Sequence, residues 1–138
     1  MQLQVKVGER IMLAEKLPVA GELNVMDKVK DIRQVLVGWG SGQMTTWNIV
    51  PVDNTFVTGV PERSAPVTLD DEDAIIVWAD IIRSLSARGL VTMAEAEIYT
   101  QIVQEAERII EERRAQQQEE EEQEPEGEGE GEGNGEQL

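Results

Sequence analysis

The sequence predicts an α+β fold that is predominantly α: two short N-terminal helices, a small β-hairpin, a C-terminal antiparallel helix hairpin and a disordered acidic tail. Apolar residues recur at helical spacing in four segments, and β-branched and aromatic residues gather in one short central segment. The last residues, 116–138, carry ten Glu and no Lys or Arg. The 138-residue chain is long enough for one core, so we expect a single compact domain over 1–115 followed by the tail.

The N-terminal third predicts a short strand and two short helices. Apolar and polar residues alternate over 3–7, which is typical of a half-buried strand. Apolar residues then recur at helical spacing over 9–17, until Pro18 ends the run. A second apolar stripe, with charged residues on the other faces, predicts an amphipathic helix over 25–36 that ends near Gly38.

The central segment predicts a small β-hairpin. Met44–Val50 and Phe56–Val60 are rich in β-branched and aromatic residues, and Asp53 and Asn54 between them are turn formers. The N-terminal strand is a candidate third strand beside this hairpin. Three prolines confine the strands to edges or short pieces: Pro51, Pro61 and Pro66.

The C-terminal half predicts two helices that form an antiparallel hairpin. A capping box starting at Thr68 precedes an apolar face over 74–85, and a second box starting at Thr92 precedes an apolar stripe over 98–110. The link over 87–91 is short, so the two helices are expected to run side by side in opposite directions.

The residue types that most catalytic and metal sites need are missing, because the chain has no His and no Cys. The acidic run at 70–73 is explained by helix capping, since consecutive positions on a helix point around its axis. The glycine run at 38–42 follows a helix and lacks the Lys-Ser/Thr of a phosphate loop. We therefore predict no catalytic, cofactor-binding or metal-ligating residues and no enzymatic activity.

The formal net charge of −16 comes mostly from the tail. Removing its ten Glu leaves 28 − 10 = 18 acidic and 12 basic residues on 1–115, a net charge of −6. Because this body is itself acidic, we expect no direct nucleic-acid binding. The tail is interpreted as a solubilising segment, with a polyanionic arm for a basic groove and an assembly spacer as alternatives.

Targeting signals are also missing from the sequence. No run of 18 apolar residues occurs, so no membrane span is expected. Residues 1–15 lack the charged, apolar and small-residue regions of a signal peptide, which predicts an intracellular protein.

Four apolar side chains are candidate partner-binding residues. Trp39 lies among glycines on the expected loop, and Trp is enriched at binding hot spots. Trp47 lies on the expected first strand of the hairpin. The last helix is longer than its hairpin partner, so Ile109 and Ile110 are expected to face a second subunit or another protein, unless the N-terminal helix folds back over them.

The chain carries Glu-Arg at 9–10 and Leu-Pro-x-x-Gly at 17–21, followed by Lys28, Asp31 and Arg33 within the expected helix over 25–36. These two segments resemble a family of small tailed-bacteriophage proteins, in which a Glu-Arg helix ending in Leu-Pro-x-x-Gly is followed by a helix carrying Lys, Asp and Arg. The chain departs from this family in the glycine run at 38–42 and in a longer stretch over 49–66. The resemblance implies a phage origin and action in the bacterial host cytoplasm or in virion assembly, and it brings no catalytic motif. The matching residues are Glu9, Arg10, Leu17, Pro18, Gly21, Lys28, Asp31, Arg33 and Leu36, then Trp47 and two helices over 75–103.

These observations together favour a non-enzymatic phage protein that binds and modulates or inhibits a host protein. The alternative is a virion structural or assembly accessory that self-associates through its C-terminal helices. A weaker alternative is a binder that sequesters a small molecule.

Overall fold

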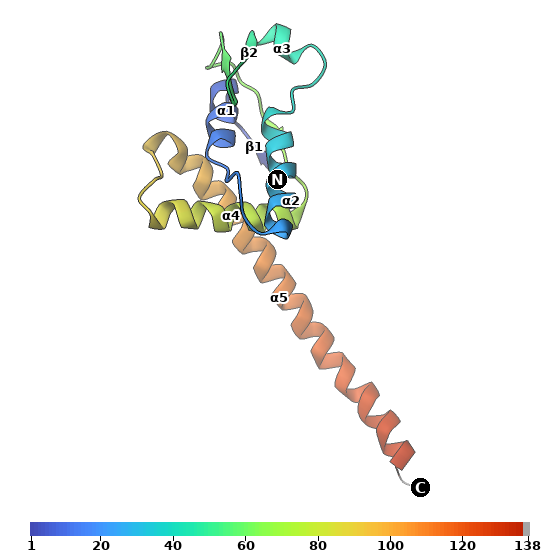
Figure 1. Ribbon diagram of the computed structural model, residues 1–138. Helices are drawn as coiled ribbons and strands as arrows, with labels where there is room; N and C mark the ends of the chain where they lie inside the picture. Colours follow the sequence, from blue (N-terminus) through green and yellow to red (C-terminus); the bar gives the residue numbers. More distant parts are fainter. Residues whose placement is uncertain (137–138) are drawn as a thin grey trace. The chain divides into compact units, whose positions relative to one another are not determined.

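The computed structural model describes the backbone of residues 1–136 and the side chains of residues 1–121 (Figure 1). It confirms an α+β fold that is predominantly α. The chain divides into two compact units, Met1–Ala106 and Glu107–Leu138. The elements in chain order are β1 (Gln2–Leu3), α1 (Val7–Glu15), α2 (Leu23–Val37), α3 (Gln43–Thr46), β2 (Ile49–Val52), β3 (Thr55–Thr58), β4 (Val67–Thr68), α4 (Glu72–Ala87) and α5 (Met93–Glu136).

The N-terminal strand β1 pairs with β4 and not with the hairpin, so that part of the expected β structure is wrong. Leu3 lies opposite Val67 in the antiparallel pair, and both side chains are buried. The strand is short because α1 begins at Val7, where the Glu9 carboxylate accepts a hydrogen bond from the Lys6 N–H at 2.8 Å. The alternating pattern therefore marked buried side chains correctly without indicating the partner strand.

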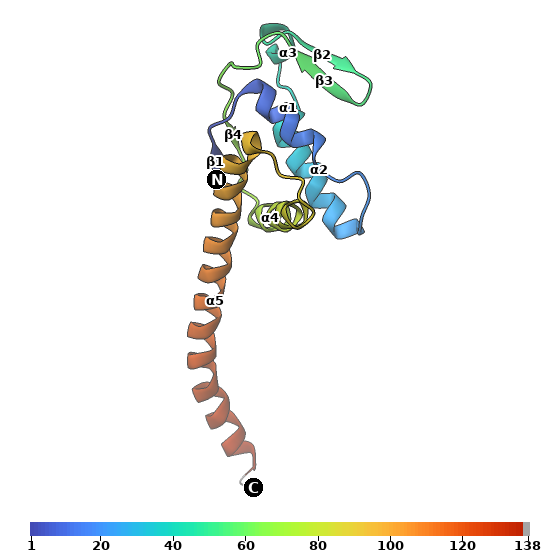
Figure 2. The ribbon, with the colours of Figure 1, turned by 90° about the vertical axis from the view of Figure 1, so that its left-hand side faces the viewer.

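The core of the first unit lies where α2 packs against both α1 and α4. Val29, Ile32 and Leu36 of α2 recur three and four residues apart and are buried on one face of the helix. Trp78 of α4 is 2% exposed and is the largest of the fully buried side chains among the described residues. This arrangement leaves the hairpin at one end of the first unit, next to α1 (Figure 2).

Helix α4 begins at an N-cap formed by Asp71, so the expected capping box starting at Thr68, which lies in β4, is wrong. The Asp71 carboxylate accepts hydrogen bonds from the N–H groups of Asp73 at 3.0 Å and Ala74 at 3.2 Å. Its second oxygen accepts a hydrogen bond from Lys28 Nζ of α2 at 2.7 Å, which is the main reason that the pKa of Asp71 lies below its ordinary value. This cap therefore joins α2 to the start of α4.

The first turns of α5 follow α4 through a short link, but the two helices cross steeply instead of lying side by side. Figure 2 shows α4 nearly end-on while α5 runs along the page. The crossing leaves an open groove of about 400 Å³, whose lining includes Ile82, Tyr99 and Val103.

Helix α5 extends past the predicted domain boundary at 115. Its backbone is helical to Glu136, and the side chains of residues 116–121 are exposed. The side chains of 122–136 and the whole of 137–138 lie outside the described residues, and the prediction of a disordered acidic tail falls mostly on them.

The β-hairpin is confirmed, with Asp53 and Asn54 between its two strands, but its first strand is shorter than expected. Residues 43–46 form the short helix α3, which follows Gly42 in a left-handed conformation with φ of 82°. Trp47 closes α3 and donates its N–H to the carbonyl of residue 43, so the expectation that Trp47 lies on a strand is wrong. The β pattern of the segment begins only after this helical turn.

Candidate protein-interaction surface

A buried arginine anchors the end of the first unit that carries the hairpin. Arg10 of α1 is 4% exposed, and its Nε donates to the carbonyl of Leu36 at 2.8 Å while Nη2 donates to that of Val35 at 3.4 Å. These carbonyls belong to the last turn of α2, where helix carbonyls have no partner within the helix and carry the negative end of the helix dipole. Burial lowers the pKa of Arg10 below its ordinary value. The guanidinium thus caps α2 from α1.

The same guanidinium lies over two tryptophan rings. Its central carbon is 4.8 Å from the ring centroid of Trp39 and 5.5 Å from that of Trp47. Trp39 meets the rings of Trp47 and Phe56 edge-on, with centroid separations of 6.1 Å and 5.7 Å. Cation–π and edge-to-face contacts of this kind are each favourable by about 0.5–1 kcal/mol. Arg10 and the three aromatic residues form one cluster, which we call the arginine–aromatic cluster.

Trp39 and Trp47 are partly buried in this cluster, so the expectation that Trp39 stands exposed on its loop is wrong. The indole N–H of Trp39 is buried and has no hydrogen-bond acceptor among the described residues. Both rings pack against a small core that connects them to α1 and β2. That core consists of Val7, Ile11, Ile49 and Ala65.

The chain segment held by this cluster, residues 38–61, is almost without charge. Charged residues make up 29% of the sequence, which corresponds to about seven in a stretch of 24, yet Asp53 is the only one in this segment. Sixteen of the 24 residues are exposed. Depletion of charged residues is the compositional mark of interface cores. We call the exposed part of this segment, apart from Asp53, the uncharged surface.

The most apolar part of the uncharged surface is one face of the hairpin. Val50 and Val57 lie directly opposite each other on β2 and β3, and Val52 follows two residues after Val50, so all three share one face. They are 53%, 49% and 42% exposed. The opposite face carries Ile49 and Phe56 toward α1 and the cluster. We call the first face the valine face.

The outer edge of β2 is blunted by Pro51. This residue pairs with Phe56 in the ladder but has no N–H, so it occupies a position whose amide side faces away from β3. An added strand would find no donor there. The edge of β2 is thus unsuited to strand addition, whereas the side chains of the valine face are exposed.

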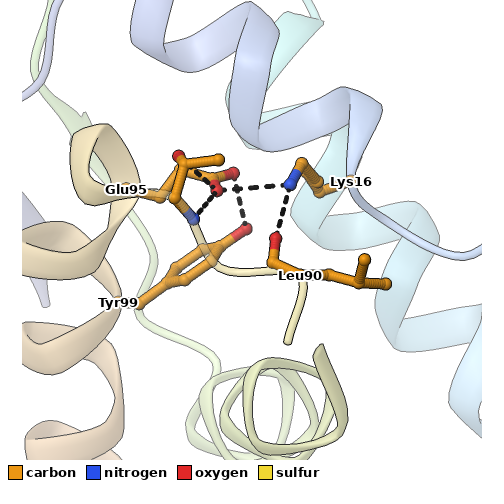
Figure 3. Close-up of polar contacts among 5 residues, drawn as sticks. Lys16, Leu90, Glu95 and Tyr99 are labelled. Carbon is orange, nitrogen blue, oxygen red and sulfur yellow. Dashed lines mark hydrogen bonds and ion pairs between the residues drawn. The ribbon is translucent and has the colours of Figure 1, made fainter. Parts of the chain in front are cut away.

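A second polar cluster lies at the other end of α1, where the start of α5 reaches it (Figure 3). Glu95 is fully buried, and its Oε1 accepts hydrogen bonds from the Thr92 N–H at 3.0 Å, the Thr92 hydroxyl at 2.8 Å and Lys16 Nζ at 3.3 Å. Lys16 also donates to the carbonyl of Leu90 at 2.8 Å, and the Tyr99 hydroxyl donates to Glu95 Oε2 at 3.3 Å. The predicted capping of α5 at Thr92 is thus confirmed in its Glu half.

The surroundings of this cluster shift the pKa of the Glu95 carboxyl and the pKa of the Tyr99 hydroxyl in opposite directions. Burial alone would raise the pKa of Glu95, but the hydrogen bonds from Thr92 and Lys16 outweigh it, and the pKa lies below its ordinary value. Burial, and then the charge of Glu95, raise the pKa of Tyr99 well above its ordinary value. Each group is therefore held in its ordinary charge state at neutral pH, and the cluster links α1 to α5.

The two other candidate residues lie on α5 in the second unit. Ile109 is 1% exposed and Ile110 is partly buried. Partner binding by Ile109, Ile110, Trp39 and Trp47 stays a prediction.

The described residues show neither a cluster of metal-binding side chains nor a membrane-spanning helix. Among these residues, no group of three or more acidic side chains is placed to hold a metal ion. None of the described helices is both long enough and apolar enough to cross a membrane.

Comparison of the chain with protein-family models, with curated proteins and with solved structures found no match. A function for this chain is therefore proposed from the geometry of the uncharged surface and of the arginine–aromatic cluster that holds it.

Sequence reasoning missed Arg10 and the valine face, although both had a signal. Arg10 lies between Val7 and Ala14 at helical spacing, which places it on the buried face of α1. The valine face was signalled by the stretch over 38–61 with a single charge in a chain otherwise rich in charge. The second signal is stronger, because it needs no knowledge of which strand faces which helix.

Proposed function

We propose that this chain is a non-enzymatic phage protein that binds and modulates another protein, most simply a host protein, through the uncharged surface. The observation that carries the proposal is the valine face, which exposes three apolar side chains on a segment with one charge in 24 residues. The phage origin rests on the sequence resemblance.

The anchoring of this surface supports the proposal. The arginine–aromatic cluster holds the hairpin against α1, so the valine face is presented on a fixed support. A two-stranded hairpin alone is only marginally stable in water. Preorganisation of this kind lowers the entropy cost of binding a partner.

Substitution of Val57 tests the proposal. The full chain carrying Val57→Asp is immobilised beside the unaltered chain, both are incubated with bacterial lysate, and retained proteins are identified by mass spectrometry. A carboxylate buried in an apolar contact weakens binding by at least about tenfold, so the partner should be lost from the variant.

Leu23→Asp is the matched control. Leu23 is 79% exposed and begins α2, outside both the uncharged surface and the hollow at the hairpin tip, so the same new charge there should leave retention unchanged. Equal retention of the same proteins by the Val57 variant and the unaltered chain would show that the valine face is not the binding surface.

A further inference from the structure

The hairpin tip places two carboxylates beside the valine face. Asp53 is exposed in the turn that directly follows Val52, and Glu15 is exposed at the end of α1. Glu15 is fixed at the hairpin because its Oε1 accepts a hydrogen bond from the Thr55 hydroxyl at 2.9 Å. Both carboxylates line one shallow hollow together with Arg33.

These carboxylates are available to a partner. Among the described residues, neither Asp53 nor Glu15 forms an ion pair with a lysine or arginine. Arg33 lines the same hollow without pairing with either of them. The tip thus carries a net negative charge at the border of an apolar face.

The charge of the whole chain acts in the same direction. With a net charge of −16, the chain repels acidic proteins and attracts basic ones, and complementary charge raises the association rate. A second copy would bring its own tip carboxylates and its own negative charge to the contact. The surface is therefore poorly suited to self-association.

We infer, resting on the proposed function, that the partner is a basic protein segment that presents apolar side chains to the valine face and a lysine or arginine to Asp53 and Glu15. The apolar contact supplies the main attraction. The carboxylates select a basic partner over an acidic one, because like charges placed at the rim of a contact disfavour binding.

Three synthetic peptides of equal length serve as probes: alternating Lys-Val, alternating Glu-Val and alternating Lys-Ser. Each is titrated into the isotopically labelled full chain, and the backbone amide signals of Val50, Val52 and Val57 are followed by NMR. Only the Lys-Val peptide is expected to shift all three signals to saturation, since it alone combines apolar and basic side chains. Its affinity should fall about two- to tenfold on going from low to physiological salt, as two exposed ion pairs predict.

A double variant, Glu15→Gln with Asp53→Asn, isolates the carboxylates. Asn tolerates the left-handed φ of 55° at position 53, so the turn is retained. We expect the double variant to bind Lys-Val about two- to tenfold more weakly and to show a smaller salt dependence than the unaltered chain. Unaltered peptide affinity in this variant would overturn the inference.

The outcomes separate this inference from the proposed function. Equal binding of Glu-Val and Lys-Val would refute the basic partner but leave the valine face as a protein-binding surface. Shifts of the three valine signals with protein concentration alone would assign the face to a second copy. No shift with any peptide, together with unchanged lysate retention by the Val57 variant, would refute both.

Discussion

Replacing Arg10 should destabilise the fold and loosen the uncharged surface. Arg10→Met keeps the length and apolar stem of the side chain but removes its charge and its donors. The bond to the Leu36 carbonyl is charge-assisted and contributes about 1.5–3 kcal/mol, and the contacts with two tryptophan rings add about 1–2 kcal/mol. The long bond to Val35 adds little.

Removing the buried charge of Arg10 offsets part of this loss of stability. Removing a desolvated guanidinium returns part of the roughly 2.5–5 kcal/mol that these lost contacts contribute, because replacing a buried ion by an apolar group is often favourable. The Leu36 carbonyl nevertheless remains without its partner, which costs about 1–3 kcal/mol. We therefore expect a net decrease of about 1–3 kcal/mol in the free energy of unfolding for Arg10→Met.

Urea unfolding checks this value. With the urea dependence usual for a small domain, a loss of 2 kcal/mol lowers the unfolding midpoint by about 1 M. Tryptophan fluorescence reports on the cluster, and far-ultraviolet circular dichroism reports on the helices. In the native baseline, the emission of the variant should move toward that of solvated tryptophan, because Trp39 and Trp47 lose the guanidinium that packs over them.

Arg10→Lys is the sharper comparison. Lysine keeps the charge and most of the stem but lacks the planar fork that bonds the carbonyls and stacks on the rings. The Arg10→Lys variant should lose at least as much stability as Arg10→Met, since its ammonium charge stays buried without the hydrogen bonds and ring stacking that the planar guanidinium makes. A lysine variant as stable as the unaltered chain, with unchanged tryptophan emission, would refute the role assigned to the guanidinium.

Three further predictions concern the hydrogen bonds and ion pairs that connect the helices. Folding lowers the pKa of Glu95, so the ionised carboxylate stabilises the fold at pH values above its unfolded pKa, and this stabilisation is lost as the pH falls through the lower folded pKa. In urea titrations at stepped pH, a Glu95→Gln variant should therefore show a free energy of unfolding that changes less with pH in that acid range. Folding raises the pKa of Tyr99, so the contribution of Tyr99 to stability is full below its unfolded pKa and is lost as the pH rises through the folded pKa. Because Tyr99 is the sole tyrosine, ultraviolet absorbance should show tyrosinate appearing only together with unfolding. An ordinary tyrosine titration in the folded protein would contradict the burial of this hydroxyl. Asp71→Ala removes the N-cap of α4 and should lower the free energy of unfolding by about 0.5–2 kcal/mol in thermal or urea unfolding, whereas Lys28→Met should cost less because the cap itself remains.

The helices could be predicted because their signals are local. Spacing of three and four residues between apolar side chains located α1, α2 and α4, and turn residues at Asp53 and Asn54 located the hairpin. The partner of the N-terminal strand could not be predicted, since Leu3 pairs with Val67, 64 positions away, and alternation says only which side chains are buried. The N-cap of α4 was misplaced at Thr68 because Asp71 offers an equally good local cap and is additionally held by Lys28.

The candidate surface was predictable only in part. The sequence predicts Trp39 as an exposed anchor, because glycines on both sides predict a loop and say nothing about what the ring packs on. Arg10, 29 residues earlier, holds Trp39 from another helix, and no local rule links the two positions. The residues that the structure exposes are the valines of the hairpin, which a sequence pattern would more readily place in a core.

The sequence by itself determined the helical class, the hairpin turn, the capping of α5 and the distribution of charge, because these depend on neighbours within a few residues or on composition alone. The tertiary structure decided which apolar residues are buried and which are exposed. Trp39 packs into the arginine–aromatic cluster, whereas the valine face of the hairpin is exposed to solvent. That choice depends on contacts between distant segments, whose energies outweigh local preference once α1, α2 and the hairpin meet.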